Sequence, residues 1–377
     1  MKIAKLAAAA AGAVLTAPSA MAEYALNMTP GVTELSREVY DLHMVILWIC
    51  VIIGVGVFGA MIVSMVLHRK SRGVEPAQFS HSTRAETIWT IIPVLILIAM
   101  ALPATRVLIE MEDTGDAEMT VKVTGYQWMW RYEYLEDEVT FLSRLASESN
   151  VARQLDSGVN VATVDNYLLD VDRPVVLPTD TKIRFLLTAD DVIHSWWVPD
   201  FGWKRDAIPG FVNEAWTRID EPGTYRGQCA ELCGKDHGFM PIVVIAKTPE
   251  DYRQWVAEQK AEQVAVAKAN DRTWTRPELM EHGEAVYQQQ CAACHMEDGS
   301  GLAPAFPALN GSDVANGPVS SHIDIVLNGR SDTPMQGFGD LLSAADIAAA
   351  ITYTRNAWGN EAGDVVQPAT IQQTKRG

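Results

Sequence analysis

The pattern of hydrophobic and polar positions changes twice along this chain, and each change marks a different kind of structure. Residues 44–67 form an uncharged apolar run, and residues 87–109 form a second one that contains two prolines. Each run is long enough to cross about 30 Å of hydrocarbon as a helix, and a neighbouring helix makes proline tolerable there. We therefore expect a transmembrane hairpin at 23–112, with helices over about 42–68 and 86–109.

The loop between the two runs carries the charges that orient the hairpin. Four basic residues and two acidic residues lie between positions 68 and 86. The positive-inside rule places this loop in the cytoplasm and everything after residue 109 outside. Residues 1–22 have two lysines, an alanine-rich run and a final AMA, which together predict a secretory signal peptide. The expected location is a bacterial inner membrane, with the later domains on the periplasmic side.

After residue 112 the hydrophobic period becomes that of β-strands. Short β-branched or aromatic runs bounded by glycine or proline lie at 119–134, 182–189, 212–219, 223–229 and 240–247. Repeated short runs of this kind predict an all-β sandwich or barrel, which we place at 113–248. The acidic stretch at 136–166 is interpreted as an insertion loop with a short helix.

The last third of the chain returns to a helical pattern. Residues 249–272 are amphipathic and predict a helical linker. Residues 273–360 form a separate all-α domain, followed by a C-terminal tail at 361–377. The predicted fold class is a multidomain membrane protein with a two-helix hairpin, an all-β domain and an all-α domain.

Charge narrows the range of partners. The 377 residues include 30 Lys and Arg against 47 Asp and Glu, for a formal net charge of −17. Such a chain repels nucleic acid and attracts basic proteins. We therefore expect membrane lipid and a cationic protein as partners, and no nucleic acid. The GVGVFG match to a dinucleotide-binding motif lies inside the first apolar run, where it indicates close helix packing instead.

The sequence CAACH at 291–295 carries the clearest chemistry. The spacing C-x-x-C-H is the attachment signature of c-type haem, in which Cys291 and Cys294 bind the vinyl groups and His295 binds the iron. A thioredoxin-like redox motif is the alternative, but no βαβ pattern surrounds these cysteines. We predict a covalent haem c in the helical domain.

The sixth ligand of this haem is expected downstream of CAACH. Met335 is the only methionine after Met296, and it precedes a helix that we expect to begin near Ser343. A thioether ligand raises the haem potential and suits electron transfer. His322 is the rival ligand, and we favour Met335 because His/Met ligation is common in electron carriers.

The segment CAELCGKDHGFMP concentrates soft metal ligands. Cys229 and Cys233 could form a disulfide, or bind zinc together with His237 and a distant histidine. Met240 favours copper, because thiolates and thioethers are the soft ligands that copper prefers. His194 supplies a second imidazole, and this set exceeds what one copper needs. The residues therefore predict two coppers held close together by bridging thiolates.

Four stretches carry a resemblance to a known family. HSWWVPDFGWKRDAIPG and GQCAELCGKDHGFMPIVV resemble the copper A domain of cytochrome c oxidase subunit II, which implies a cupredoxin-like fold. AETIWTIIPVLILI and GYQWMWRYEY resemble the anchor and the segment that follows it in the same family. The helical domain resembles a class I cytochrome c. From Tyr40 to Asn360, the chain resembles a subunit II with a fused C-terminal cytochrome c domain.

The resemblance implies a binuclear copper A site and a magnesium ion shared with subunit I. The implied ligands are Cys229 and Cys233 as bridges, His194 and Met240 on one copper, and His237 and the carbonyl of Glu231 on the other. The resemblance also assigns the carboxylate of Glu231 to the magnesium ion.

Four further residues receive roles from the resemblance. Trp128 matches the aromatic side chain through which electrons reach copper A. Glu133 and Asp191 match acidic positions that bind a basic donor cytochrome c. Glu86 matches the acid at the cytoplasmic entrance of a proton channel in subunit I.

The implied function is that of the subunit through which electrons enter a proton-pumping haem–copper cytochrome c oxidase. Electrons would pass from a donor cytochrome through haem c and copper A to subunit I, where oxygen is reduced. The alternatives are a copper A subunit of a membrane nitric oxide reductase, a soluble nitrous oxide reductase, and a copper chaperone or free carrier. The membrane anchor argues against the soluble enzyme, and the complete ligand set argues against a chaperone.

Overall fold

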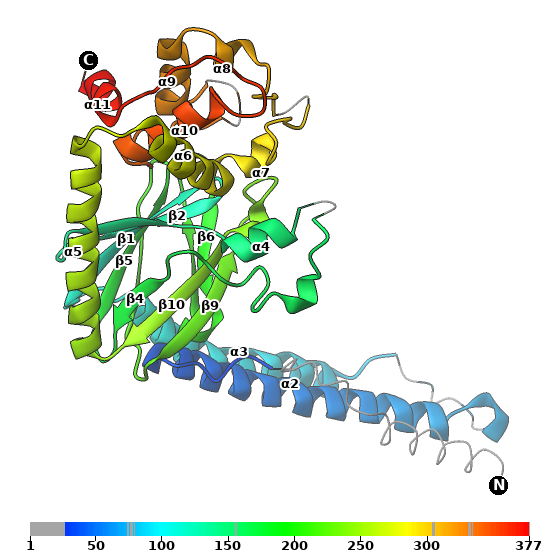
Figure 1. Cartoon of the computed structure of the whole chain (residues 1–377). Coiled ribbons are helices and arrows are strands. Elements are labelled where there is room, and N and C mark those ends of the chain that lie inside the picture. Colours follow the sequence, from blue (N-terminus) through cyan, green and yellow to red (C-terminus); the bar gives the residue numbers. More distant parts are fainter. Residues whose placement is uncertain are drawn as a thin grey trace.

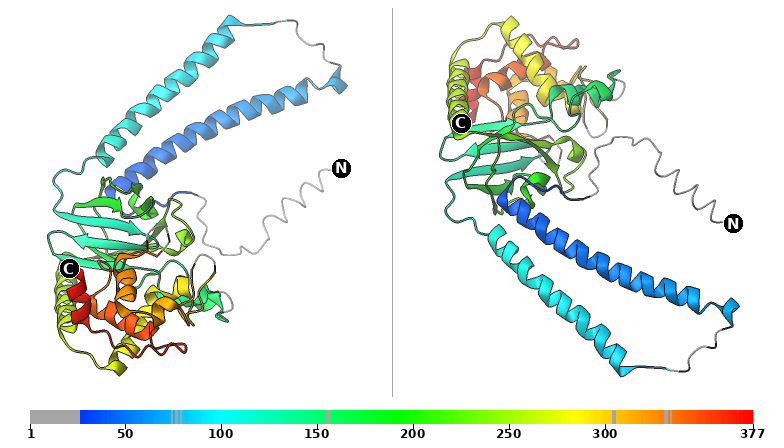
Figure 2. Two further views of the ribbon diagram at one scale, coloured as in Figure 1. Left: turned by 90° about the horizontal axis from the view of Figure 1, so that it is seen from above. Right: turned by 90° about the horizontal axis from the view of Figure 1, so that it is seen from below.

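The computed structural model describes residues 27–73, 75, 78, 80–154, 157–303, 306–330, 333 and 335–376. The predicted signal peptide at 1–22 lies outside these residues. A long helical hairpin, a β domain and a compact helical domain follow one another along the chain (Figure 1). The helical domain lies on the end of the β domain opposite the hairpin, and both further views show the same arrangement (Figure 2).

The hairpin consists of α2 (Glu34–Leu67) and α3 (Thr83–Met111), with the short 3₁₀ helix η1 (Lys70–Arg72) after the first helix. Both helices are long and apolar enough to cross a membrane, with mean hydropathies of 2.8 and 2.2 over their most apolar windows. Neither window is buried inside the protein. The first helix begins at Glu34 rather than near residue 42, because the Thr33 hydroxyl accepts a hydrogen bond from the Ser36 N–H and caps the helix there.

Both ends of the hairpin are attached to the β domain. Leu35, in the first turn of α2, is 1% exposed and belongs to the core of that domain. The adjacent Arg37 forms an ion pair with Asp220. At the end of α3, the Trp216 indole N–H donates to the carbonyl of Glu110 at 2.9 Å. These contacts fix the β domain directly above the hairpin.

The β domain contains two five-stranded sheets with the orders β3-β2-β1-β5-β8 and β4-β10-β9-β6-β7. The strands are β1 (Met119–Tyr126), β2 (Met129–Tyr134), β3 (Val139–Ser143), β4 (Val175–Pro178), β5 (Ile183–Ala189), β6 (His194–Val198), β7 (Trp203–Ala207), β8 (Asn213–Thr217), β9 (Gly223–Cys229) and β10 (Pro241–Lys247). Alternate residues of β5 are buried, as expected for a strand with one face on a core. The chain thus has the two-sheet β fold that its sequence predicts.

Three local features of the β domain differ from the predicted pattern. The run at 119–134 is two antiparallel strands, β1 and β2, with Tyr126 opposite Met129 across a two-residue turn. The acidic stretch at 136–166 contains a full strand, β3, in addition to the short helix α4 (Ser147–Ala152) and the 3₁₀ helix η2 (Val161–Thr163). The 3₁₀ helix η3 (Pro199–Phe201) lies against the start of α2, where the Val32 N–H donates to the Asp200 carbonyl, and η4 (His237–Phe239) lies in a loop of the site described below.

The helix α5 (Pro249–Asp271) runs along one side of the β domain and leads into the helical domain (Figure 1). That domain contains α6 (Arg276–Gln290), α7 (Ala292–His295), α8 (Asp313–Asn316), α9 (Val319–Asn328), α10 (Ala344–Thr354) and α11 (Pro368–Arg376). Val366 and Ile371 are buried in its core. The domain therefore extends past Asn360, the boundary expected from the sequence.

Helices α6 and α10 cross at Gly283, where the two backbones approach closely. A Cβ atom on Gly283 would lie 2.2 Å from the carbonyl oxygen of Ala349. We expect Gly283→Ala to lower the free energy of unfolding of the helical domain by about 1–3 kcal/mol, the usual cost of overpacking. Denaturant unfolding followed by the absorbance of the haem would measure this loss. Glu281→Ala, on the exposed face of α6, is the matched control, and equal stability of the two variants would contradict the close crossing.

Candidate metal centre and haem cavity

The predicted copper ligands converge on one end of the β domain. His194 begins β6, Cys229 ends β9, and the loop before β10 carries the remaining ligands. His194, Cys229 and Cys233 are buried, and one potential ligand atom from each lies within 4.8 Å of the others. The Sγ atoms of the two cysteines are 3.9 Å apart. Both thiols are free in the structure.

Each cysteine sulfur contacts one predicted ligand of each copper. Cys229 Sγ lies 3.9 Å from His194 Nδ1 and 3.4 Å from the Glu231 carbonyl oxygen. Cys233 Sγ lies 3.5 Å from His237 Nδ1 and 3.5 Å from Met240 Sδ. A sulfur that bridges two metals must adjoin the other ligands of both, and the two sulfurs here do so.

The two thiols and the His194 imidazole of this cluster have shifted pKa values. The contact between the two sulfurs lowers the pKa of Cys229, and the same contact raises the pKa of Cys233. Burial opposes the charged form of His194, but hydrogen bonds with Asp191 and Cys229 outweigh burial and raise its pKa. The cluster thus holds one thiolate readily, and thiolate is the form that binds a metal.

Asp191 and Gly125 fix the orientation of the His194 ring. Asp191 Oδ1 lies 2.9 Å from His194 Nε2, so Nε2 carries the proton and Nδ1 is left to face Cys229. A Cβ atom on Gly125 would lie 2.8 Å from the ring, so no larger residue fits beside it. The donor set of thiolates, imidazoles and a thioether, oriented in this way, suits a copper centre.

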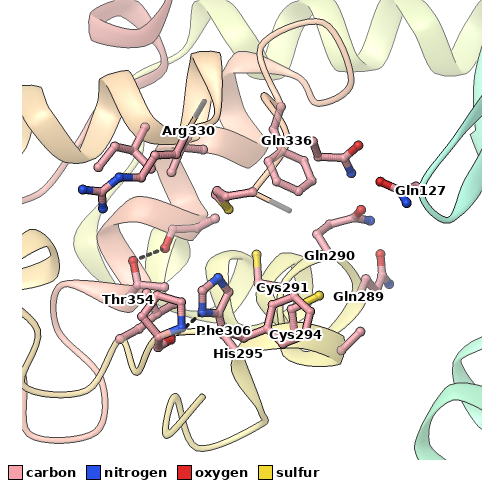
Figure 3. A pocket seen from close by; sticks show the side chains of 18 of the residues that line it. Gln127, Gln289, Gln290, Cys291, Cys294, His295, Phe306, Arg330, Gln336 and Thr354 are labelled. Carbon is pink, nitrogen blue, oxygen red and sulfur yellow. Dashed lines mark hydrogen bonds between the residues drawn. The ribbon is translucent and has the colours of Figure 1, made fainter. Parts of the chain in front are cut away.

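The haem attachment residues line a cavity of ≈ 510 Å³ at the junction of the helical and β domains. Cys291, Cys294 and His295 form one wall, and Gln127 reaches the cavity from the β domain (Figure 3). The size is typical of cofactor cavities, which run from about 300 to 1,000 Å³. Two free thiols and an imidazole on one wall fit a covalently attached haem.

The His295 ring is oriented so that it could bind the haem iron. Its Nδ1 lies 2.8 Å from the Pro307 carbonyl oxygen, so Nδ1 donates and Nε2 remains available. Burial lowers the pKa of this imidazole, and the bond to Pro307 offsets part of the shift. Met335 and His322 both line the cavity, as the predicted sixth ligand and its rival. Burial lowers the pKa of His322 to about 4, and its Nδ1 has no partner among the described residues.

The turn between β1 and β2 joins the two sites. Gln127 Nε2 donates to the Cys233 carbonyl at 2.8 Å, and Trp128 Nε1 donates to the same oxygen at 3.2 Å. Both side chains also line the haem cavity. Trp128 therefore contacts a predicted copper ligand on one side and the haem cavity on the other.

The remaining predicted residues occupy varied environments. Glu133 forms ion pairs with Lys122 and Arg131 and is 22% exposed. Glu86 lies in the first turn of α3 and accepts the Ser82 N–H at 3.1 Å, which is a helix-capping contact. The Glu231 side chain is exposed. Their roles in donor binding, proton transfer and magnesium binding stay predictions, as does the docking role of Asp191.

Sequence reasoning missed several residues around these sites. Arg153 forms an ion pair with Asp236, beside His237, and stacks on Phe239. The supporting role of Gly125 was also missed, although a glycine within a strand pattern signals close approach by another group. No local pattern signals the Arg153 contact, because 83 residues separate its partners.

Comparison with known proteins assigns the β domain and its anchor. The profile described as "Cytochrome C oxidase subunit II, periplasmic domain" matches residues 119–247, and that of the transmembrane domain of subunit II matches residues 21–107. A probable cytochrome c oxidase subunit 2 of Rickettsia bellii is 39% identical over 235 residues, which cover 62% of this chain and 84% of the relative. The chain belongs to the cytochrome c oxidase subunit II family.

A second relative agrees with this assignment, and a solved structure is also similar to the chain. Cytochrome c oxidase subunit 2 of Cereibacter sphaeroides is 34% identical over 239 residues, covering 61% of this chain and 79% of the relative. The crystal structure of the periplasmic domain of subunit II of cytochrome oxidase of Bradyrhizobium japonicum is 37% identical, covers 40% of this chain and 98% of that chain, and gives a TM-score of 0.35.

The helical domain is an addition to the subunit II core. The profile described as "Cytochrome C oxidase, cbb3-type, subunit III" matches residues 278–353, which include the CAACH motif. The two families imply copper in the β domain and haem in the helical domain. This subunit II is therefore a membrane-anchored component of a cytochrome c oxidase complex, with a cytochrome c domain at its C-terminal end and an electron-accepting role.

The contact between Asp191 and His194 predicts an effect on copper binding. We expect Asp191→Asn to weaken copper binding by the purified apo protein roughly 10–100-fold, the usual loss for a residue that orients a ligating histidine. Copper affinity should fall as pH drops, because protons compete for His194, and the lower pKa in the variant should move this fall to more acidic pH. Competition with a copper chelator measures both effects. Asp190→Asn, at the exposed neighbouring position, is the control, and equal affinities for the two variants would contradict the orienting role.

Proposed function

We propose that this chain is the subunit through which electrons enter a proton-pumping haem–copper oxidase, in the order donor cytochrome, haem c, binuclear copper A, subunit I. The observation that carries the proposal is the shared position of Trp128. Its indole donates to the Cys233 carbonyl and lines the cavity that contains Cys291, Cys294 and His295.

The short connection between the sites supports direct transfer between them. Gln127 and Trp128 lie between the haem cavity and residues 230–240, which we call the copper loop. Both side chains donate to the carbonyl of Cys233, whose sulfur is expected to bridge the coppers. The Lys235 ammonium lies over the ring of Phe306 in the helical domain, 4.6 Å from the ring centroid. Lys235 lies between Cys233 and His237, so the copper loop itself contacts the helical domain.

The docked helical domain also determines where a soluble donor can act. The face of the β domain at Trp128 borders the haem cavity, so a donor protein does not have free access to that indole. Helix α5 holds the helical domain in place, and a short tether of this kind gives an effective concentration in the millimolar range. A basic donor, attracted by a chain with net charge −17, therefore delivers its electron to the haem domain first.

The proposed copper A site follows from the positions of the two sulfurs. His194 and Met240 would complete one copper, and His237 and the Glu231 carbonyl the other, with each sulfur adjoining one member of both pairs. Two coppers in a preformed thiolate cage supply a one-electron centre with little rearrangement on reduction. Subunit I would receive the electron, share a magnesium ion through Glu231, and take protons near Glu86.

Metal content tests the binuclear site. We expect two coppers and one covalent haem per chain in the detergent-purified protein. Cys229→Ser should abolish the mixed-valence copper signal in electron paramagnetic resonance, because a hydroxyl does not replace a bridging thiolate, while the haem absorbance stays intact. Zinc in place of copper, a single copper, or a surviving signal in Cys229→Ser would each contradict the binuclear site.

Rapid mixing of reduced donor with oxidised enzyme tests the order of transfer. We expect the haem absorbance to change before the copper absorbance, and Trp128→Phe to slow the second step because the indole N–H to Cys233 is lost. Trp255→Phe is the matched control, since Trp255 packs on Tyr134 and Phe141 away from the haem cavity. Reduction of copper before haem, together with full donor oxidation after truncation at Asn270, would exclude the haem as the first acceptor.

A further inference from the structure

The β domain contributes a half-buried cation, Arg144, to the haem cavity. Arg144 directly follows β3 and lines the cavity together with Cys291 and His295. It also lines an adjoining cavity between β3, α5 and α6, so its side chain lies inside the domain junction. The sequence pattern gave this residue no role, because it lies in the acidic stretch interpreted as an insertion loop.

The Arg144 guanidinium includes a hydrogen-bond donor that has no acceptor among the described residues. Its Nη2 is shielded from solvent and has no hydrogen-bond partner among the described residues. Arg153, the other β-domain arginine lining the cavity, contrasts with it because both of its terminal nitrogens bond to the Asp236 carboxylate, at 3.3 and 3.1 Å. A buried donor without a partner is costly, typically about 1–3 kcal/mol. The structure thus holds an unpaired N–H at the wall of a cofactor cavity.

The backbone around Arg144 holds it in this position. The Arg144 N–H donates to Asp172 Oδ1 at 2.7 Å, and the Asp172 N–H donates to the Arg144 carbonyl at 3.0 Å. Asp172 adds a favourable charge interaction, but burial dominates and lowers the pKa of Arg144 to about 10. The guanidinium therefore remains positive at neutral pH.

We propose that Arg144 is an electrostatic residue of the haem site, supplied by the β domain, which favours the reduced state of haem c. The inference rests on the proposed function, because it requires a haem in the cavity. Reduction adds one electron and no other group, so the oxidised haem carries one more positive charge than the reduced haem. A fixed cation in a cavity shielded from water repels the oxidised form more strongly. Because Arg144 belongs to the β domain, the reduction potential of the haem then depends on the contact between the two domains.

Potentiometric titration of the haem absorbance in the full-length, detergent-purified chain tests this role. We expect Arg144→Gln to lower the equilibrium constant for haem reduction about tenfold, which corresponds to about 59 mV for a one-electron couple. Arg173→Gln removes the same charge from the same junction, at a side chain that pairs with Glu262 on α5 and is 38% exposed. That control should shift the constant less than twofold, because an exposed charge is screened. The shift in Arg144→Gln should persist at high salt, since Arg144 Nη2 is shielded from solvent.

Arg144→Lys keeps the charge and provides a second test if Arg144→Gln does not assemble. We expect its haem potential to match the wild type at neutral pH and to fall at a lower alkaline pH than in the wild type, because a buried ammonium loses its proton more readily than a guanidinium. A shift below twofold in Arg144→Gln with haem attached, or a pH-independent potential in Arg144→Lys, would overturn the role of Arg144. Absence of covalent haem from the wild-type chain would instead overturn the proposed function, and this inference with it.

Discussion

The carbonyl oxygen of Cys233 accepts two side-chain hydrogen bonds from the β1–β2 turn, and the relation between the two cofactor sites depends on this contact. Gln127 and Trp128 donate to it at 2.8 and 3.2 Å. The copper loop has no regular structure apart from η4, so its backbone groups lack the hydrogen bonds that a sheet would supply. The side-chain bonds to the Cys233 carbonyl hold the loop instead. The same bonds hold the turn against the haem cavity. A single backbone carbonyl therefore positions a predicted bridging ligand and the aromatic side chain beside the haem.

Charge at the domain junction is arranged differently from charge on the rest of the chain. The chain as a whole is strongly acidic, yet the β domain presents several cations to the helical domain or its cavity, among them Arg144, Arg153 and Lys235. Arg153 is neutralised by Asp236, and Lys235 lies over the Phe306 ring. In the proposed order of transfer, positive groups at the junction would favour the arrival of an electron there, and the net negative charge of the chain would attract a basic donor. The two sets of charges would then act at successive stages of the proposed transfer.

The sequence predicted features that depend on neighbouring residues and missed those that depend on distant ones. The two apolar runs, the CAACH motif and the cluster from Cys229 to Met240 are local, so period and spacing were enough. The division of 119–134 into β1 and β2 was missed, because aromatic residues continue through the turn and no glycine or proline marks it. The half-buried position of Arg144 was missed for a different reason. It depends on packing against α6, more than 130 residues away, and a charge in an acidic stretch gives no local signal of burial.

The order of the domains along the chain follows from where each must lie. The hairpin comes first and is fixed to the β domain through Leu35 and Trp216, so that the β domain stays next to the membrane. The helical domain comes last and lies at the end of the β domain far from the hairpin (Figure 1), where the proposed donor would meet it from the aqueous phase. Helix α5 makes this possible because 23 residues at about 1.5 Å each span the length of the β domain. A shorter linker would leave the haem cavity away from Trp128, and a flexible one would leave Arg144 facing water for part of the time. The helix α5 keeps both residues at the wall of the haem cavity.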